Sequence, residues 1–399
     1  MSHPSRRRLV PRLGALLALL LLSVAFAACG SSDSGDDATA SSGGASTTAV
    51  SDGVATAQAS IAKASESPAF VAPASFDPSP AKGKTVWWIG DQTSDIIKQW
   101  TKSAKEAFAS QGVTLKVYDP GNTPAEHIKG INLAIAGKAD AIILGDGNSP
   151  VQFAAQVKKA KDAGIPFFSL VAGTPEFQPK VDGLDLDVSY DYVAVGKLLA
   201  DWFIADSKGK GNALLIESPD IPSSTLELNG FRDRVKELAP DAKVTTKKYS
   251  ITKSADGGAK DVANIARTSV VQDPKIDYII PAFDSVALFA QTGVQLAGAQ
   301  NRVKLAGFNS IVPQMQALKK GNGPFKMDIG GVNEWLAYAL ADNVLRKLSD
   351  QPLVKDPKVG VRVFTHDNVQ DLNVDRENDK EWYGFDYPAQ YPGKVWVTK

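Results

Sequence analysis

The chain has 399 residues, of which 43% are hydrophobic and 22% charged, so it carries enough apolar side chain to build large cores. Lysine plus arginine and aspartate plus glutamate both number 44. This balance argues against a general nucleic-acid binder, which neutralises phosphates with a basic excess. Cys29 is the single cysteine, which excludes an intramolecular disulfide and a structural zinc site built on cysteine pairs.

The first 28 residues have the pattern of an export signal. A basic run with Arg6, Arg7, Arg8 and Arg12 precedes the uncharged stretch 13–28, which is short for a permanent span because a transmembrane helix needs about 20 apolar residues. Removing residues 1–28 takes away four basic side chains and no acidic one, so 40 basic side chains then face 44 acidic ones. We therefore expect an exported, mildly acidic mature protein.

The residues around Cys29 resemble the cleavage site of a bacterial lipoprotein signal. Ala27 and Ala28 precede the cysteine and Gly30 follows it, although Phe26 stands where leucine is more usual. A lipid on the thiol together with an N-acyl chain would supply the multiple chains that stable anchoring requires. The alternative is ordinary secretory cleavage after Ala27, which would leave a stray cysteine. We expect lipidation of Cys29 and a location on the outer face of the cell membrane, or in the periplasm.

Residues 29–83 have the composition of a flexible tether. The run that follows Cys29 is rich in Ser, Gly, Ala and Asp and has little capacity to form a core. Weak helical spacing over 54–66 allows a short helix there, and the segment 67–84 is interrupted by prolines. We expect the folded body to begin near Lys84.

Apolar strands and amphipathic helices alternate through the body. In its first half the expected strands are 85–90, 113–119, 139–145 and 165–171, and the expected helices are 96–108, one around 128–133, and 151–163. In its second half the expected strands are 212–218, 242–250, 277–283, 303–308 and 324–331, and the expected helices are 223–238, 261–271, 284–297, 312–320 and 334–348. This pattern predicts an α/β protein with parallel sheets covered on both faces, in which ligands bind beyond the carboxyl ends of the strands.

Polar and aromatic side chains stand at or just beyond these strand ends. The candidate ligand-binding residues are Trp88, Asp91, Gln92, Asp146, Asn148, Tyr190, Thr225, Phe283, Asp284, Asn309 and Asn333. Carboxylates, amides and hydroxyls suit a neutral or weakly cationic solute that carries hydroxyl or amide groups, and the ring of Phe283 or Trp88 would cover an apolar face of it. A purely structural role as helix N-caps carries equal weight for Asp191, Ser223 and Asp284.

The sequence lacks the motifs of the common enzyme classes. It has no phosphate loop, no G-x-S-x-G elbow and no H-E-x-x-H, and His127 and His366, the histidines beyond the signal, are expected at the surface. A carboxylate pair of the glycosidase type is the enzymatic alternative, but the tether and the doubled α/β layout argue against it. We expect no catalytic residue, no cofactor and no metal.

The order and spacing of several segments resemble type I periplasmic binding proteins of the ribose-binding kind, the substrate-binding subunits of ABC importers. The resemblance covers residues 84 to about 370, and it rests on KTVWWIGDQTSDIIKQWTKSAKEAF, ADAIILGDGNSP, AGIPFFSL, VSYDYVAVGKLLADWFIA, NGFRDRVKEL, DYIIPAFDSVALFAQTGVQLAG, VKLAGFNS and VFTHDNV. It implies an N-terminal lobe of 84–189 plus 331–352 and a C-terminal lobe of 190–330 plus 353–399. Three crossings near 189–190, 330–331 and 351–353 would form the hinge.

What this resemblance implies for function is capture of a small solute by hinge closure, followed by delivery to the permease of an ABC transporter. We expect a monomer. A surface sensor that presents the ligand to a receptor kinase or chemoreceptor has the same fold and is the alternative. A DNA-binding repressor of this fold is excluded, because export removes the protein from DNA and no helix-turn-helix precedes Lys84.

The departures from the family pattern concern the ligand. The place at the start of the first helix where sugar binders carry paired aromatic rings is occupied here by Ile96, Ile97 and Lys98. The family's aspartate after the ninth strand is Asn309. One arginine of the family corresponds to Val171 or Ala172, a second arginine corresponds to Thr225, and an amide corresponds to a position near Gly330. The positions that match the family are Asp284 and, loosely, Asp146 with Asn148. A site without those arginines is poorly suited to an anion.

Overall fold

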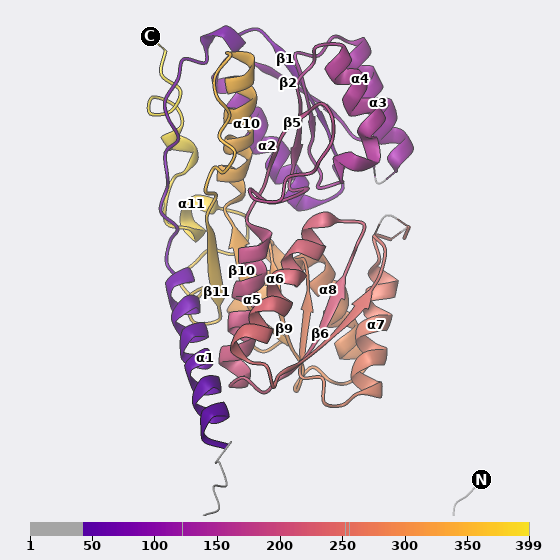
Figure 1. Ribbon diagram of the computed structural model, residues 1–399, viewed down its shortest axis with the longest axis vertical. Helices are drawn as coiled ribbons and strands as arrows, with labels where there is room; N and C mark the ends of the chain where they lie inside the picture. The colour runs from indigo at the N-terminus through magenta and orange to yellow at the C-terminus, as the bar shows by residue number, and fades with distance from the viewer. Residues whose placement is uncertain (1–42, 122, 252, 255, 399) are drawn as a thin grey trace, which may run out of the picture. The chain divides into compact units, whose positions relative to one another are not determined.

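Two β-sheets organise the body, one from each half of the chain (Figure 1). The computed structural model describes residues 43–121, 123–251, 253–254 and 256–398. The predicted signal at 1–28 and the predicted lipidation site Cys29 lie outside these residues. No helix in the described part of the chain is long and apolar enough to cross a bilayer.

The first sheet is parallel throughout, with the strand order β2-β1-β3-β4-β5. Its strands are β1 (Thr85–Ile89), β2 (Thr114–Tyr118), β3 (Ala141–Leu144), β4 (Phe167–Leu170) and β5 (Leu184–Val188). Trp88 packs into the core on the side of α2 (Asp95–Ser110), whereas Ile89 packs into the core that includes Ile131 and Phe153. The inner strands β1, β3 and β4 are therefore largely buried on both faces because helices cover both, whereas the edge strand β2 is mostly exposed.

The second sheet has the order β11-β10-β9-β8-β6-β7. Its strands are β6 (Asn212–Glu217), β7 (Lys243–Lys248), β8 (Tyr278–Pro281), β9 (Lys304–Phe308), β10 (Phe325–Gly331) and β11 (Val361–Thr365). All neighbours are parallel except β10 and β11, which pair antiparallel with Gly331 opposite Val361. The chain returns from the other lobe at the carboxyl end of β10, so a strand that starts there must run back along it. The predicted fold of two parallel α/β lobes is confirmed, with this one antiparallel edge strand.

The helices confirm the predicted alternation of strand and helix. The longer ones are α3 (Pro124–Ala136), α4 (Ala154–Asp162), α5 (Tyr192–Ser207), α6 (Pro222–Leu238), α7 (Ala259–Gln272), α8 (Asp284–Leu296), α9 (Val312–Lys320) and α10 (Asn333–Leu348). The shorter ones are η1 (Ser79–Ala81), η2 (Pro150–Phe153), α11 (Asp379–Trp382) and η3 (Pro388–Gln390). Gly196 and Gly230 let the backbones of α5 and α6 touch, since a Cβ at either glycine would lie less than 3.0 Å from a carbonyl oxygen of the other helix.

The segment before Lys84 differs from the expected flexible tether. Residues Gly43–Ala64 form the helix α1, which packs on α5 and α6 with Ala57 fully buried (Figure 1). A Cβ at Gly53 would lie less than 3.0 Å from the carbonyl oxygen of Leu238, so the two backbones are in contact. Small side chains, which made the sequence look like a solvated linker, are what allow this close approach. The fold therefore already includes residues 43–64, ahead of the expected start near Lys84.

The extended chain between α1 and β1 is held by the C-terminal tail. The hydroxyl of Tyr387 donates to the carbonyl oxygen of Pro68 at 2.6 Å. The backbone N–H of Phe76 donates to the carbonyl oxygen of Val395 at 2.8 Å, and the N–H of Val397 donates to that of Phe76 at 2.9 Å. These bonds tie both ends of the folded chain together, a pairing between residues about 320 positions apart that local sequence patterns do not report.

The tail also differs from its predicted place in the C-terminal lobe. Strand β11 does join the second sheet, but Trp396 stacks on Tyr338 of α10 with a centroid distance of 5.8 Å. Its indole N–H donates to Asp342 of the same helix at 2.8 Å. Because α10 packs on α2, the end of the tail belongs with the N-terminal lobe. The predicted assignment of 353–399 to the C-terminal lobe is therefore split. Strand β11 lies in the C-terminal lobe, and the chain that follows it crosses to the N-terminal lobe.

Candidate functional site

The loops that follow β1 and β3 meet at the carboxyl ends of their strands. One carboxylate oxygen of Asp146 accepts the backbone N–H of Asp91 at 3.2 Å, and the other accepts the N–H of Asn148 at 3.4 Å. Gln92 follows Asp91 in the first of these loops and is half-buried, and its backbone N–H donates to Asp119 at 3.2 Å. The structure thus brings together Asp91, Gln92, Asp146 and Asn148, which the sequence placed at two separate strand ends.

His127 joins this group, although the sequence suggested a surface residue. Its side chain is 1% exposed, and its Nε2 lies 2.6 Å from a carboxylate oxygen of Asp146. Its Nδ1 lies 2.8 Å from the carbonyl oxygen of Thr123, and its ring stacks on Phe153. Burial opposes the charged ring, but the bond to Asp146, the charge of that carboxylate and the Thr123 carbonyl outweigh it and raise the pKa of His127.

Asp91 and Gln92 use part of their hydrogen-bonding capacity within the loop after β1. The carboxylate of Asp91 accepts the backbone N–H and the hydroxyl of Thr93, at 2.9 Å and 2.8 Å. The amide of Gln92 donates to the carbonyl oxygen of Gly90 at 2.9 Å and to the hydroxyl of Thr101 at 3.2 Å. Asp91 is 4% exposed, so it shapes the loop, whereas Gln92 keeps an exposed edge.

Trp88 lies beneath these loops rather than beside them. Its side chain is fully buried, and a Cβ at Gly145 would lie less than 3.0 Å from its indole ring. In this structure the ring therefore forms the floor under the two loops and offers no face to solvent. A Cβ at Gly90 would likewise lie less than 3.0 Å from this indole, so glycine at 90 and 145 leaves room for the ring.

The loop after β4 is organised by a buried carboxylate. Asp187 on β5 accepts the hydroxyls of Ser169 and Ser189, each at 2.6 Å, and the backbone N–H groups of Ala172 and Gly173, each at 3.0 Å. Val171 has φ of 56°, a left-handed conformation that a β-branched residue rarely adopts. Strain of this kind at a strand end is typical of a functional loop.

In the C-terminal lobe, Asp284 is fully buried at the start of α8 and beside the loop after β9. One of its oxygens accepts the backbone N–H of Ile311 at 3.0 Å, and the other has no hydrogen-bond partner. Burial raises the pKa of Asp284 to about 7, and burial together with the charge of Asp284 raises the pKa of Asp328 well above its usual range. Glu227 of α6 is also fully buried, and burial raises its pKa well above the usual range. Burial therefore disfavours the ionised form of each of these carboxyl groups.

The remaining candidates of the C-terminal lobe are more accessible. Phe283 is partly buried and packs against the core, and Asn309 is 9% exposed with φ of 133°. The hydroxyl of Thr225 donates to the carboxylate of Glu217 at 3.2 Å. Asn309 is thus a second strained strand-end residue, in the lobe opposite Val171.

Tyr190 and Asn333 meet at the hinge. The side-chain oxygen of Asn333 accepts the hydroxyl of Tyr190 and the indole N–H of Trp100, both at 2.9 Å. Tyr190 is fully buried and Asn333 is 3% exposed, so both have internal roles here. Tyr383 of the tail, which the sequence did not single out, lies close by: its hydroxyl donates to the carbonyl oxygen of Gly331 at 2.8 Å and lies 2.9 Å from the hydroxyl of Ser310.

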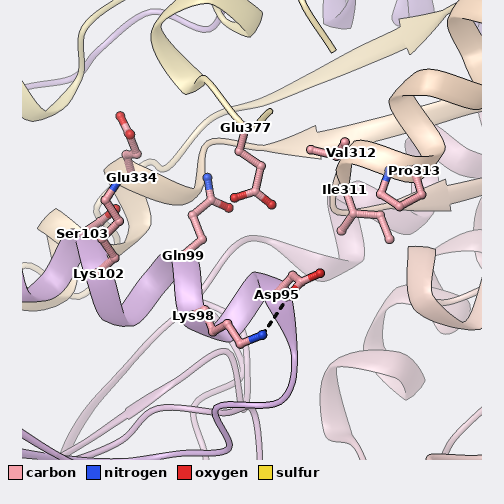
Figure 2. Close-up of a pocket in the computed structure, with 10 residues that line it drawn as sticks. All are labelled: Asp95, Lys98, Gln99, Lys102, Ser103, Ile311, Val312, Pro313, Glu334 and Glu377. Carbon is pink, nitrogen blue, oxygen red and sulfur yellow. Dashed lines mark hydrogen bonds and ion pairs between the residues drawn. The ribbon is translucent and has the colours of Figure 1, made fainter. Parts of the chain in front are cut away.

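A cavity of about 390 Å³ lies where the two lobes meet (Figure 2). Its lining residues are Asp95, Lys98, Gln99, Lys102, Ser103, Ile311, Val312, Pro313, Glu334 and Glu377. Gln99 and Glu377 face each other across it, and Lys98 pairs with Asp95 at 3.0 Å (Figure 2). Burial, together with the charges of Asp95 and Glu334, raises the pKa of Glu377 to about 7. None of the predicted ligand residues lines this cavity, but Asp95 and Ile311 lie within three residues of Gln92 and Asn309 along the chain.

Comparison with known proteins relates this architecture to a family. The family model described as "Periplasmic binding protein domain" matches residues 86–351, which is more than half of the chain. A galactofuranose-binding protein of Escherichia coli is 30% identical over 36% of this chain and 45% of its own length. A xylitol-binding protein of Mycolicibacterium smegmatis is 27% identical over 58% of this chain and 62% of its own length. The chain thus spans less than two thirds of both relatives.

Solved structures share the fold at low sequence identity. An ABC transporter solute-binding protein of Agrobacterium vitis with bound allitol matches with a TM-score of 0.65 at 19% identity, over 73% of this chain and 98% of its own. A 5-methylthioribose transporter solute-binding protein of Thermotoga lettingae matches with a TM-score of 0.65 at 17% identity, over 79% and 96%. With the family match across both sheets, these findings lead to one conclusion: the chain belongs to the periplasmic binding protein family.

Proposed function

We propose that this protein is an extracytoplasmic solute-binding subunit of an ABC importer and that it captures a small neutral sugar or polyol between its lobes. The observation that carries the proposal is the family match over 86–351, which includes strands of both sheets and the first two segments that join them. The two relatives are named for galactofuranose and xylitol, and the two structures are described with allitol and 5-methylthioribose. All four are hydroxyl-bearing solutes, which supports the same class here.

The contacts to the solute come from the strand-end residues that keep an exposed edge. Gln92 and Asn148 supply amide groups from the N-terminal lobe, and Phe283, Asn309 and Thr225 supply a ring, an amide and a hydroxyl from the C-terminal lobe. Amides and hydroxyls donate and accept at defined angles, which suits a polyol. The predicted set contains no arginine or lysine, so it is a poor match for a phosphate or carboxylate.

The fully buried candidates support the site from behind. Trp88 forms the floor under the loops after β1 and β3, Asp284 fixes the loop after β9, and Tyr190 and Asn333 connect the lobes at the hinge. A solute that contacts both lobes binds the closed arrangement more tightly than the open one, so it shifts the population towards closure. The closed protein then docks on the permease in the membrane.

The membrane anchor is part of the same proposal. A lipid on Cys29 would hold the folded body on the outer face of the membrane. Metabolic labelling with palmitate and membrane fractionation test it: a Cys29→Ala protein should lose the label and leave the membrane fraction. A variant that stays with the membrane as well as the parent does would contradict the anchor.

A solute panel tests the binding function. Thermal melts of residues 43–399 in xylitol, allitol, D-galactose, D-ribose, an amino-acid mixture and glucose 6-phosphate should show stabilisation by at least one sugar or polyol. Titration calorimetry then measures its Kd for Gln92→Ala, Asn148→Ala and Phe283→Ala, each of which should weaken binding by about tenfold, because a bound polar or apolar group loses its partner. Gln300→Ala, an exposed residue beyond α8, is the matched control and should bind normally. Stabilisation by the phosphate ester alone would overturn the assignment.

A further inference from the structure

Nδ1 of His127 faces a carbonyl oxygen, and Nε2 lies closest to a carboxylate oxygen of Asp146, with the side-chain amide nitrogen of Asn148 farther away at 3.3 Å. Nδ1 lies 2.8 Å from the carbonyl oxygen of Thr123, and Nε2 lies 2.6 Å from a carboxylate oxygen of Asp146. A neutral imidazole carries one N–H and satisfies only one such acceptor, whereas an imidazolium satisfies both. The geometry therefore fits a charged ring paired with an ionised Asp146.

This ion pair is buried inside the N-terminal lobe. The two side chains are each 1% exposed, and the ring of Phe153 stacks on the imidazole at a centroid distance of 5.4 Å. Removing two charges from water is costly, so a buried pair without further partners is a weak source of stability. Here the carboxylate also holds the backbone of Asp91 and of Asn148, which gives the pair a second task.

The groups that face His127 define its electrostatic surroundings. Asp146 follows β3 and Asp91 follows β1, and both carboxylates favour the charged ring. From η2 the ring meets Phe153, which is uncharged. On α3 itself, Glu126 and Lys129 pair with each other at 3.0 Å at the surface. Among the described residues, the carboxylates of Asp146 and Asp91 thus act on this histidine at the strand ends.

We propose that His127, as an imidazolium paired with Asp146, is a positioning residue that holds the loops carrying Gln92 and Asn148 in place for the solute, so that affinity falls when the ring loses its proton at alkaline pH. The inference rests on the proposed function of those two loops. The sign follows from the folded state: a raised pKa means that the charged form persists to higher pH than in an ordinary histidine and is lost as the pH rises through the raised value. The pair then loses its positive charge, and the one N–H that is left serves either Asp146 or the carbonyl of Thr123 but not both.

Nuclear magnetic resonance of the imidazole nitrogens tests the charge directly. The chain has three histidines, so the signals of His127 are assigned by their absence in His127→Gln. At about pH 7 we expect both nitrogens of His127 to be protonated, although a free histidine is then mostly neutral. Asp146→Asn should lower the pH at which these signals change, because it removes the partner charge. One protonated and one bare nitrogen at this pH would overturn the ion pair.

Calorimetric titration with the best-bound sugar of the panel tests the role in binding. Between about pH 6 and about pH 9 the Kd of the parent should rise by about threefold or more, since the imidazolium is lost within or beyond the histidine range. His127→Gln should bind more weakly at the lower pH and show no such rise. His366→Gln is the matched control and should keep the parent's pH profile. His366 follows β11 in the C-terminal lobe, where its Nδ1 lies 2.9 Å from the carbonyl oxygen of Leu318.

The outcomes separate this inference from the proposed function. An unchanged pH profile in a folded His127→Gln protein would overturn the positioning role while leaving solute binding intact. If no sugar or polyol binds, the proposed function fails, and with it the positioning role, whereas the ring-nitrogen signals still decide the ion pair. A His127→Gln protein that does not fold is replaced by Asp146→Asn, in which the alkaline loss of affinity should move to lower pH.

Discussion

A methyl group added at Gly330 should disturb the second crossing between the lobes. An alanine Cβ there would lie less than 3.0 Å from the hydroxyl of Tyr383, the ring of Phe364 and the hydroxyl of Ser310. All three side chains are buried, so none can retreat into solvent. Overpacking a filled core costs about 1 to 3 kcal/mol, and displacing the Tyr383 hydroxyl from the Gly331 carbonyl would add about 1 kcal/mol or more.

We therefore expect Gly330→Ala to lower the free energy of unfolding by about 2 to 4 kcal/mol, measured by urea denaturation of the empty protein. Gly323→Ala is the matched control, because no atom lies within 4 Å of its added Cβ and its φ is not left-handed. Tyr383→Phe removes one of the crowding atoms, so Gly330→Ala in that background should cost less than in the parent. If Gly330→Ala and Gly323→Ala unfold at the same urea concentration, the packing described for this crossing is wrong.

Three further predictions concern stability. Asp342→Asn should cost about 3 to 5 kcal/mol in urea denaturation, because it leaves the buried guanidinium of Arg346 without its charge partner; a loss below about 1 kcal/mol would contradict a buried ion pair. Gly53→Ala should detach α1 by pushing it from the carbonyl of Leu238, and limited proteolysis should then cut within 43–64; equal resistance in parent and variant would show that α1 accommodates the methyl group. The folded pKa of Asp284, about 7, exceeds its unfolded value. The contribution of this carboxyl group to the free energy of unfolding is therefore fully present below about pH 4 and is lost as the pH rises to about 7, so Asp284→Asn should make this decline shallower by up to about 1.4 kcal/mol per pH unit. An identical slope in the variant would argue that the carboxyl is ionised in the native protein.

Most of the fold follows from local sequence patterns. Strands such as 139–145 and 277–283 are short apolar runs followed by helical spacing, and a parallel sheet buries such strands on both faces. The segment 43–83 and the tail could not be placed in this way. Ala-rich and Pro-rich stretches carry no strong period, and their positions depend on contacts such as Phe76 with Val395, which join distant parts of the chain.

The sequence predicts which candidate residues lie close together but not the role of each. The strand-end rule grouped Asp91, Asp146 and Asn148 correctly, because carboxyl ends of neighbouring parallel strands share one edge. It could not tell a ligand contact from an internal one, and Asn333 proves to bind Tyr190 and Trp100 instead. His127 was missed because a single polar residue within a helix usually faces water, and only the fold places Asp146 beside it.

The central claim is that a small neutral solute closes the two lobes on one another. Small-angle scattering of the purified body, without and with a saturating concentration of the sugar or polyol that binds best, measures this most directly. Converting a mostly open population to a mostly closed one requires a difference in affinity worth roughly 5.5 kcal/mol, which micromolar binding, at about 8 kcal/mol in total, can supply. We predict that the radius of gyration falls on saturation and returns after dialysis. An unchanged radius in a sample whose solute binding is confirmed by calorimetry would contradict capture by lobe closure.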